Sequence, residues 1–423
     1  MENNWFKTLI SVAVNEMNHA LKDSGVLLFF VVVPLLYPLL YAYLYNGETI
    51  HEVPVVAVDE CHSAESRQFL RKADGTPDLK IISYCADIGE ARELIRRHKA
   101  YGLIHIPSDF SKELAEGRQA TVNTYSDMSG LLYYKALLSG CTQVSLSMNR
   151  EIKMTRLSGM SDREKEVMTK PIEYDYVAMF NPQNGFCTFL IPAVLILLIQ
   201  QTMVLGVSLL AGTERERRMK GLEIIGDYNT SPLAILAGRG MCYFIIYSGI
   251  CLYTLCIVPK MFNLIQLWQP QDIILFCIPY ILSCVFFAIS ISYFVKERES
   301  CFLLFVFASV PLLFMSGISW PASNIPAFWK WFSYIFPSTF GINGFVRMTN
   351  TGASLYQIRH EYICLWIQTG FYFMMSVMIY IRLFRSDYMP DVKYIRQAAL
   401  QRINRRKEKI GERVNRIRTK FDR

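Results

Sequence analysis

The stretch Phe186-Cys187-Thr188-Phe189-Leu190 opens an apolar run that continues to Leu210-Ala211 without an Asp, Glu, Lys or Arg. A helix of ~20 such residues can cross the ~30 Å hydrocarbon layer of a membrane. An apolar span joined directly to a charged helix indicates a lever that transmits motion: the apolar part lies in lipid, and the charged part contacts a soluble partner at the membrane surface. The run predicts a span that breaks at Gly212 and leads into a short helix, here called the charged segment, Thr213-Glu214-Arg215-Glu216-Arg217-Arg218-Met219-Lys220-Gly221-Leu222-Glu223.

Long apolar runs recur along the chain. Of its 423 residues 52% are hydrophobic, and their clustering excludes an ordinary soluble domain. The pattern predicts an α-helical multi-pass membrane protein. The first run starts after about 25 residues of mixed polarity and lacks a clear cleavage site, so we expect it to remain as an anchor. Six spans are expected, at residues 25–45, 186–211, 241–259, 273–295, 301–318 and 363–384, of which the fifth is short.

The basic residues near the span ends predict the orientation. The tail after Phe384 holds 13 Lys and Arg against 5 acidic residues, whereas the short loop at 260–272 offers only Lys260 as a base. Because Lys and Arg accumulate on the cytoplasmic side, both termini and the charged segment are expected on the cytoplasmic side of the membrane. The membrane is expected to be a bacterial inner (plasma) membrane. The insert at 46–185 is then extracytoplasmic.

Both ends of the chain are expected to form amphipathic helices. Residues 1–24 favour a cytoplasmic interfacial helix on the membrane surface, with a helix packed on the protein as the alternative. Three placements remain open for the basic tail at 385–423: it lies on the anionic inner leaflet, it packs on a partner, or it forms a solvated charged helix. The apolar positions of the first helix are Phe6, Leu9, Ala13, Met17 and Leu21.

The insert at 46–185 alternates strand and helix patterns. This order predicts a small α/β domain built from βαβ crossovers, followed by a long helix from Met128 to about residue 161. The insert holds three cysteines, so at most one disulfide can form there, and Cys61–Cys85 is the plausible pair. The strands are expected at 53–58, 81–84, 103–106 and 121–125.

The segment at 316–341 is apolar and aromatic but is interrupted by prolines. The prolines disfavour one straight span, and two short helices that dip into the outer leaflet are expected, with their broken backbone buried against protein. Tryptophans at this depth fit the aromatic belt of a membrane interface. The residues that define this hairpin are Gly317, Trp320, Pro321, Pro326, Trp329 and Pro337.

Within the charged segment, Thr213 and Glu216 form a T-x-x-E capping box that predicts a helix start. Glu214–Arg218 and Glu216–Lys220 are acid-to-base pairs at i,i+4, and Gly221 is placed to end the helix. A helix this short is not stable alone, so it is expected to dock on another surface. A solvated connecting turn is the alternative.

The charged segment, the long insert after the first span and the Ser-Gly-Ile…Trp-Pro…Ile-Pro…Phe-Pro-Ser-Thr-Phe order ahead of the last span resemble the permease subunits of type-2 (type V) ABC exporters, in the branch with a large extracytoplasmic domain. The resemblance covers essentially the whole chain. The apolar runs place five of the six spans in a domain at residues 186–384. The resemblance implies that 213–223 is a coupling helix which fits a cleft in a separate ATPase, and that 316–341 is an outer re-entrant hairpin that helps to close the exit. The coupling residues it implies are Thr213, Glu214, Arg215, Glu216, Arg217, Arg218, Lys220, Gly221 and Glu223, although many members place Gly directly after the charged quartet.

No catalytic or metal-binding motif is visible in the sequence. It contains no G-x-x-x-x-G-K-[ST] phosphate loop, so no cofactor is expected on this chain and ATP with Mg²⁺ must bind the partner ATPase. We therefore expect a transport subunit that is not itself an enzyme. The other expected partners are a second permease copy or a paralogue, a periplasmic adaptor and membrane lipid, with no nucleic acid.

Three classes of function remain open from the sequence. The first is an exporter subunit for a lipid, drug or peptide. The second is a secondary transporter or channel, which usually needs ionisable residues deep in the bilayer. The third is a membrane-tethered sensor with an external ligand-binding domain, for which one span would suffice.

Overall fold

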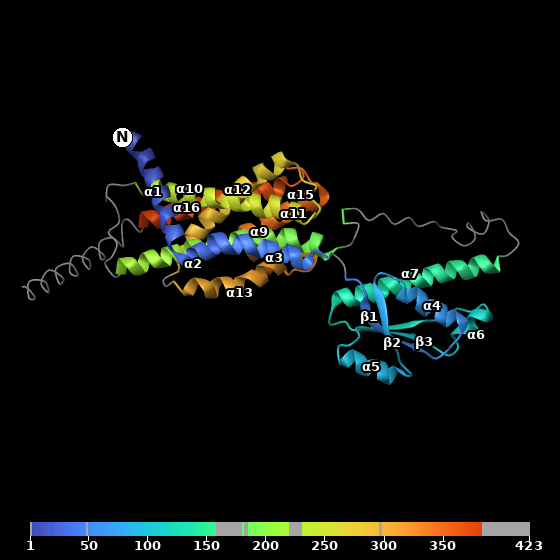
Figure 1. Cartoon of the computed structure of the whole chain (residues 1–423). Coiled ribbons are helices and arrows are strands. Elements are labelled where there is room, and N and C mark those ends of the chain that lie inside the picture. Colours follow the sequence, from blue (N-terminus) through green and yellow to red (C-terminus); the bar gives the residue numbers. More distant parts are fainter. Residues whose placement is uncertain are drawn as a thin grey trace, which may run out of the picture. The chain divides into compact units, whose positions relative to one another are not determined.

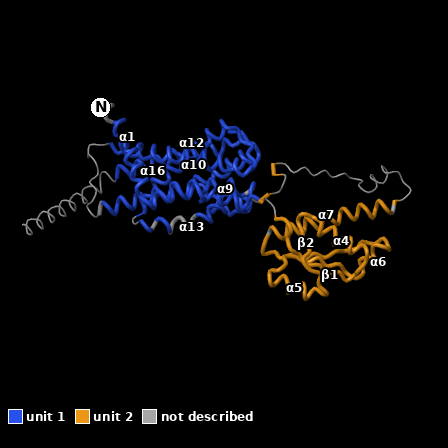
Figure 2. Tube along the Cα trace, in the orientation of Figure 1, with its two compact units in different colours: residues 1–46, 186–423 blue, residues 47–185 orange. Residues whose placement is uncertain are grey.

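The computed structural model describes residues 2–47, 50–157, 180–181, 185–219, 231–295 and 298–382. It divides into two compact units (Figure 2). Unit 1 comprises Met1–Asn46 and Phe186–Arg423, and unit 2 comprises Gly47–Gly185. The predicted tail at 385–423 lies outside the described residues.

Unit 1 is helical. In Figure 1, α1, the start of α2 and the C-terminal end of α9 lie at one end of this unit, and α11 and α15 lie at the other. Its elements are α1 (Glu2–Lys22), α2 (Ser24–Leu27), the π-helical turn η1 (Leu28–Val32), α3 (Val33–Tyr45), α9 (Phe186–Met219), α10 (Pro232–Leu252), the π-helical turn η2 (Tyr253–Ile257), α11 (Val258–Met261), α12 (Pro270–Ser292), α13 (Ser300–Met315), the 3-10 turn η3 (Ala322–Asn324), α14 (Ala327–Ser333), α15 (Pro337–Thr351) and α16 (Arg359–Arg382).

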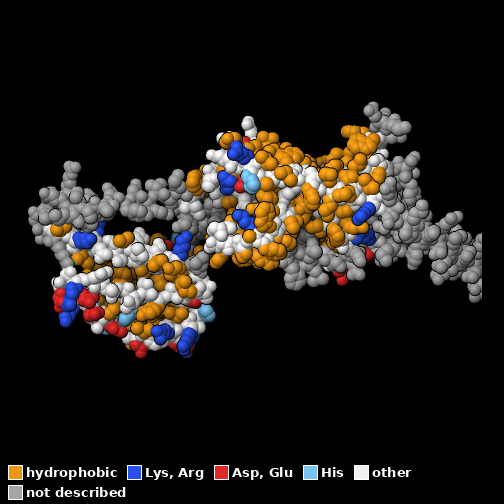
Figure 3. Space-filling model, turned by 180° about the vertical axis from the view of Figure 1, so that it is seen from behind, with side chains coloured by type: hydrophobic (Ala, Val, Ile, Leu, Met, Phe, Trp, Pro, Cys, Tyr) orange, Lys and Arg blue, Asp and Glu red, His pale blue; other side chains and the backbone are white. Residues whose placement is uncertain are grey.

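Five helical stretches in the described residues are long and apolar enough to cross a membrane, and they coincide with five of the six expected spans. The remaining candidate, at 301–318, is the 16-residue helix α13, which is too short alone and ends before Gly317. Apolar side chains cover much of the face of unit 1 in Figure 3, whereas the face of unit 2 is mixed with charges. The five stretches are Ser24–Tyr45, Leu190–Arg217, Pro232–Met261, Pro270–Ser292 and Arg359–Arg382.

Helix α9 forms the centre of unit 1. Its apolar stretch is largely buried, and it packs on α12, α15, α13 and α3. The Tyr280 hydroxyl donates a 2.6 Å hydrogen bond to the carbonyl of Ile196. Phe30 packs so closely on Gly206 that a Cβ there would lie 2.0 Å from the Phe30 ring. Glycine at 206 is therefore required by the approach of η1 to α9.

Helix α1 packs on α10, which agrees with the alternative of a helix held on the protein. The predicted apolar stripe is divided: Leu9 and Ala13 are buried, while Phe6 and Leu21 are exposed. The close approach depends on Gly238 of α10, where a Cβ would lie 2.8 Å from the Leu9 carbonyl oxygen.

Unit 2 is a four-stranded sheet in the order β2-β1-β3-β4, with β1 parallel to β2 and β3 and with β4 antiparallel to β3. Helices α4 and α7 cover one face, where Val55 and Ile104 are buried, and α5 covers the other, where Val56 and Leu103 are buried. The alternation in β1 places valines on both faces, as expected for a strand covered on two sides. The elements are β1 (Val53–Asp59), α4 (Ala64–Asp74), β2 (Leu79–Tyr84), α5 (Ile88–Arg96), β3 (Gly102–Ile106), α6 (Phe110–Ala115), β4 (Asn123–Ser126) and α7 (Leu131–Arg156).

The disulfide considered between Cys61 and Cys85 is absent, because both are free thiols. Cys61 packs against the core under α4 and α7, whereas Cys85 belongs to the core under α5. The sheet therefore lies between them. The sequence spacing did not show that they lie on opposite faces.

Replacing Gly206 with Leu should lower the free energy of unfolding by about 1–3 kcal/mol, because the added side chain has no room beside Phe30. The melting temperature of the detergent-solubilised protein, followed by tryptophan fluorescence, measures this change. Gly249→Leu is the matched control, since a Cβ at Gly249 meets no atom within 4 Å. Equal melting temperatures for the two variants would contradict the packing argument.

Candidate functional site

Helix α9 runs without interruption from Phe186 to Met219, so the predicted break at Gly212 is wrong. Thr213 consequently lies inside a helix and cannot act as its N-cap. Gly212 has another role: a Cβ at this position would lie 3.0 Å from the Cα of Arg298. The glycine permits a close approach of two backbones and does not end the helix. Lys220, Gly221 and Glu223 lie outside the described residues.

The first ionic cluster at this end of unit 1 is centred on Arg239 of α10. Its Nη2 lies 2.8 Å from Glu214 Oε2 of α9, and its Nε lies 3.3 Å from Glu16 Oε2 of α1. Its Nη1 donates a 3.0 Å hydrogen bond to the hydroxyl of Tyr380 on α16. The Tyr243 hydroxyl donates a short hydrogen bond to Glu16. One arginine therefore connects four helices of unit 1: α1, α9, α10 and α16.

The second cluster joins Asp23, Thr213 and Arg298. Arg298 Nη2 lies 2.7 Å from Asp23 Oδ1, and the Thr213 hydroxyl donates to Asp23 Oδ2 at 3.3 Å. Asp23 also caps α2 by accepting hydrogen bonds from the N–H groups of Gly25 and Val26, at 3.0 and 3.3 Å. Thus α9 is attached to the start of α2 as well as to the segment before α13.

The pKa of Asp23 reflects two opposing effects. Burial raises it, whereas the hydrogen bond and the charge of Arg298, together with the backbone donors of α2, lower it. The net pKa is below the ordinary aspartate value. Asp23 therefore stays ionised at neutral pH, and its contribution to stability is lost only when the pH falls through that lowered pKa.

Arg215 closes the C-terminal end of α12. Its guanidinium donates to the carbonyls of Val295 and Tyr293, the latter at 2.8 Å, and lies 5.6 Å from the centroid of the Tyr293 ring. Carbonyls at a helix C-terminus lack partners within the helix, and a cation is favourable there.

The residues predicted to contact a partner therefore divide into two groups. Thr213, Glu214 and Arg215 are engaged within unit 1, whereas Glu216 is half-buried and Arg217 is exposed at the surface. Helix α9 includes Arg218, whose side chain is not described. Among the described members of the charged segment, Arg217 is the most accessible to a partner.

The sequence analysis did not identify Glu16, Asp23, Arg239 and Arg298 as members of this site. One signal was available: Arg239 lies within the apolar stretch Pro232–Met261, where an ionisable side chain needs a partner. The identity of its two carboxylate partners, which are distant in sequence, could not be read from the chain.

The segment at 316–341 contains one short helix, α14, and the first turns of α15. The second predicted helix is longer than expected, because α15 continues to Thr351 and is largely buried. Gly317 has a φ of +88° after α13, which suits glycine. Pro321 and Pro326 precede η3 and α14, and Pro337 is the first residue of α15.

The tryptophan side chains of this hairpin are exposed, while its second helix is attached to α9. Trp320, Trp329 and Trp331 all present large fractions of their surface. The Ser338 N–H, at the start of α15, donates a 2.6 Å hydrogen bond to Gln200 Oε1 of α9. The same central helix therefore contacts the hairpin at one end of unit 1 and the ionic clusters at the other (Figure 1).

Among the described residues, no group of three or more His, Cys, Asp or Glu is arranged to hold a metal ion. The family model described as ABC-2 family transporter protein matches residues 25–378. This match includes α9, α10, α12 and most of α16, as well as unit 2. No curated protein matches the sequence.

Replacing Arg239 with Met should lower the free energy of unfolding by about 3–5 kcal/mol, because Glu16 and Glu214 would be left without their shared counter-charge. The melting temperature of the purified protein reports the loss. The triple variant E16Q/E214Q/R239M should recover most of it, since no uncompensated charge remains. If the triple variant is no more stable than R239M, compensation of charge is not the interaction that holds these helices together.

Proposed function

The chain belongs to the ABC-2 transporter family, and from this premise we propose that it is the permease subunit of an ATP-driven exporter in a bacterial inner membrane. Members of this family are membrane components of ABC transporters, which work with an ATPase. The observation that carries the proposal is the family match over most of the chain, and the ionic clusters at the end of α9 add a candidate attachment point for the ATPase.

The ATPase is a separate chain in this proposal, since the sequence has no phosphate loop. It contacts the end of α9 that presents Arg217. When ATP closes two such ATPases, the displacement enters α9 directly, because no hinge separates the charged residues from the apolar helix. Arg239 and Asp23 then transmit it to α1, α10, α16 and α2 through the contacts described above.

The path for the substrate lies between two permeases, either two copies of this chain or one copy and a paralogue. The spans are largely apolar, which suits a lipid, a drug or an apolar peptide. The aromatic hairpin at 316–341 closes the exit, and its link to α9 through Gln200 and Ser338 lets the ATPase end act on that exit.

The course of the stretch Ser24–Tyr45, which comprises α2, η1 and α3, and that of α9 support the orientation. Asp23 and Thr213 lie side by side at one end of these helices, so the chain leaves unit 1 at Asn46 and returns at Phe186 at the opposite end. If the charged end is cytoplasmic, unit 2 is extracytoplasmic and both termini are cytoplasmic. The 13 basic residues of the tail agree with this orientation. Unit 2 is then placed to receive a periplasmic adaptor.

A secondary transporter agrees less well with the charges. In the five apolar stretches, the described charged residues other than Arg239 lie in terminal turns, and Arg239 is compensated by two carboxylates. A sensor needs one span, whereas five stretches are long enough to cross a membrane. The ABC permease is therefore the function that we propose.

Topology can be measured with a membrane-impermeant maleimide. Above the background of the parent protein, Arg217→Cys should be labelled only in inside-out vesicles, and Arg96→Cys in unit 2 only in right-side-out vesicles. Both positions are exposed. Labelling of Arg217→Cys from the outside would overturn the proposed orientation.

Arg217→Glu should reduce the stimulation of the co-purified ATPase and the rate of transport by at least tenfold, because it reverses the exposed charge at the proposed contact. The melting temperature should stay within about 2 °C of the parent, as is typical of exposed substitutions. Arg96→Glu is the matched control and should change neither activity. Full stimulation of the ATPase by the Arg217→Glu variant would show that Arg217 is not part of the contact. Failure of any ATPase to co-purify would count against the proposed function itself.

A further inference from the structure

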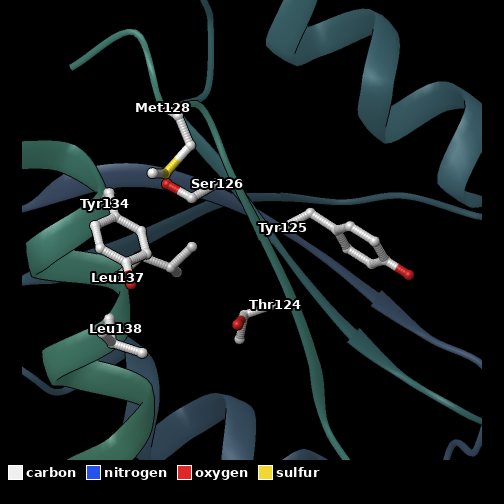
Figure 4. A pocket seen from close by; sticks show the side chains of 7 residues that line it. All are labelled: Thr124, Tyr125, Ser126, Met128, Tyr134, Leu137 and Leu138. Atoms are coloured by element: carbon white, nitrogen blue, oxygen red, sulfur yellow. The ribbon is translucent and has the colours of Figure 1, made fainter. Parts of the chain in front are cut away.

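Unit 2 contains a pocket between its last strand and its longest helix. Its volume is about 330 Å³, within the range of pockets that hold ligands. Figure 4 shows Tyr134, Leu137 and Leu138 projecting from α7 on one side, Met128 and Ser126 above them, and Tyr125 pointing away. The lining residues are Thr124, Tyr125, Ser126, Met128, Tyr134, Leu137 and Leu138, none of which is charged.

The strand beside this pocket, β4, is at an edge of the sheet, and among the described residues it pairs with β3 alone. Asp127 donates its N–H to the carbonyl of Tyr101, at the end of the β3–β4 ladder. Because backbone groups alternate in direction along an antiparallel strand, those of Tyr125 face β3, and those of Thr124 and Ser126 face the open edge. The open edge thus presents N–H and C=O groups that can pair with another strand.

The side chains of Thr124 and Ser126 face the same side of the sheet as α7, because they pair with Ile104 and Gly102. The Ser126 hydroxyl is buried and has no hydrogen-bond partner among the described residues. A buried hydroxyl without a partner costs free energy. A polar group of a ligand placed at this edge could supply the missing hydrogen bond.

We propose that this pocket binds an extended peptide segment of a partner protein, which adds to β4 as a further strand. The open edge supplies main-chain hydrogen bonds, and the pocket under α7 takes one uncharged apolar side chain of the segment, while the side chains on either side of it point away. The uncharged lining disfavours an acidic or basic side chain, since burying it would leave its charge uncompensated. This inference concerns unit 2 alone and does not depend on the transport function proposed above.

The test uses the full-length protein in detergent and a pool of fluorescein-labelled pentapeptides with blocked ends. The central residue of each peptide is Val, Leu, Ile, Phe or Asp, and the flanking residues are Thr and Ser. Fluorescence anisotropy should show saturable binding for apolar central residues and binding at least tenfold weaker for Asp. The same peptides with N-methyl groups on the amides that pair with the edge should bind at least tenfold more weakly, because they lose those donors.

Two variants of the protein separate the pocket from the edge. Leu138→Asp places a charge in the pocket and should weaken binding at least tenfold, whereas Leu146→Asp, at an exposed position two turns further along the same helix, should leave it within twofold. Thr124→Pro removes an N–H from the open edge and should abolish binding, and the fold should persist because that N–H takes no part in the ladder.

Melting temperatures within about 2 °C of the parent confirm that the exposed substitutions leave unit 2 folded. The proposal is overturned if no peptide of the pool binds, if the N-methylated peptides bind as well as their parents, or if Leu138→Asp and Leu146→Asp bind alike. If the peptides bind but the protein does not stimulate a co-purified ATPase, the result supports this inference and counts only against the proposed transport function.

Discussion

Arg239 places a positive charge inside an otherwise apolar stretch, and the arrangement of the cytoplasm-facing end in the proposed orientation depends on how that charge is compensated. Removing a charged side chain from water costs several kcal/mol, which is offset only by close partners with good geometry. Glu214 and Glu16 supply those partners from α9 and α1, and Tyr380 adds a hydrogen bond from α16. These four helices cannot separate without leaving a charge uncompensated in an apolar environment. The ion pair with Glu16 thereby attaches α1, which is long but not apolar enough to cross a membrane, to α10.

The regular features of the fold could be predicted from local pattern. The apolar runs predicted the long helices of unit 1, and the valine-rich run at 53–58 predicted β1, because each signal is contained in a few consecutive residues. The predictions that failed depended on contacts between distant residues. Gly212 was read as a helix breaker, whereas its small size serves the approach of Arg298. Cys61 and Cys85 were the plausible disulfide pair among the three cysteines of the insert but lie on opposite faces of one sheet.

The candidate site shows the same distinction. The sequence located the charged residues that end α9 but could not show that the first residues of this segment are engaged with other helices of unit 1. Thr213, Glu214 and Arg215 each meet a partner more than 20 residues away in sequence. The described part of the charged segment therefore differs along its length: Thr213, Glu214 and Arg215 anchor α9 to its neighbours, and Arg217 is exposed at the surface.

The unbroken course of α9 also determines how distant events in unit 1 can be synchronised. Gln200, which holds the start of α15, and Thr213, which contacts Asp23, are about 20 Å apart on the same rigid rod. A rod that slides or turns moves both of its attachments in the same instant, with no intervening joint to absorb or delay the motion. In the proposed function, opening at one surface and engagement of the ATPase at the other would therefore follow the same displacement of α9.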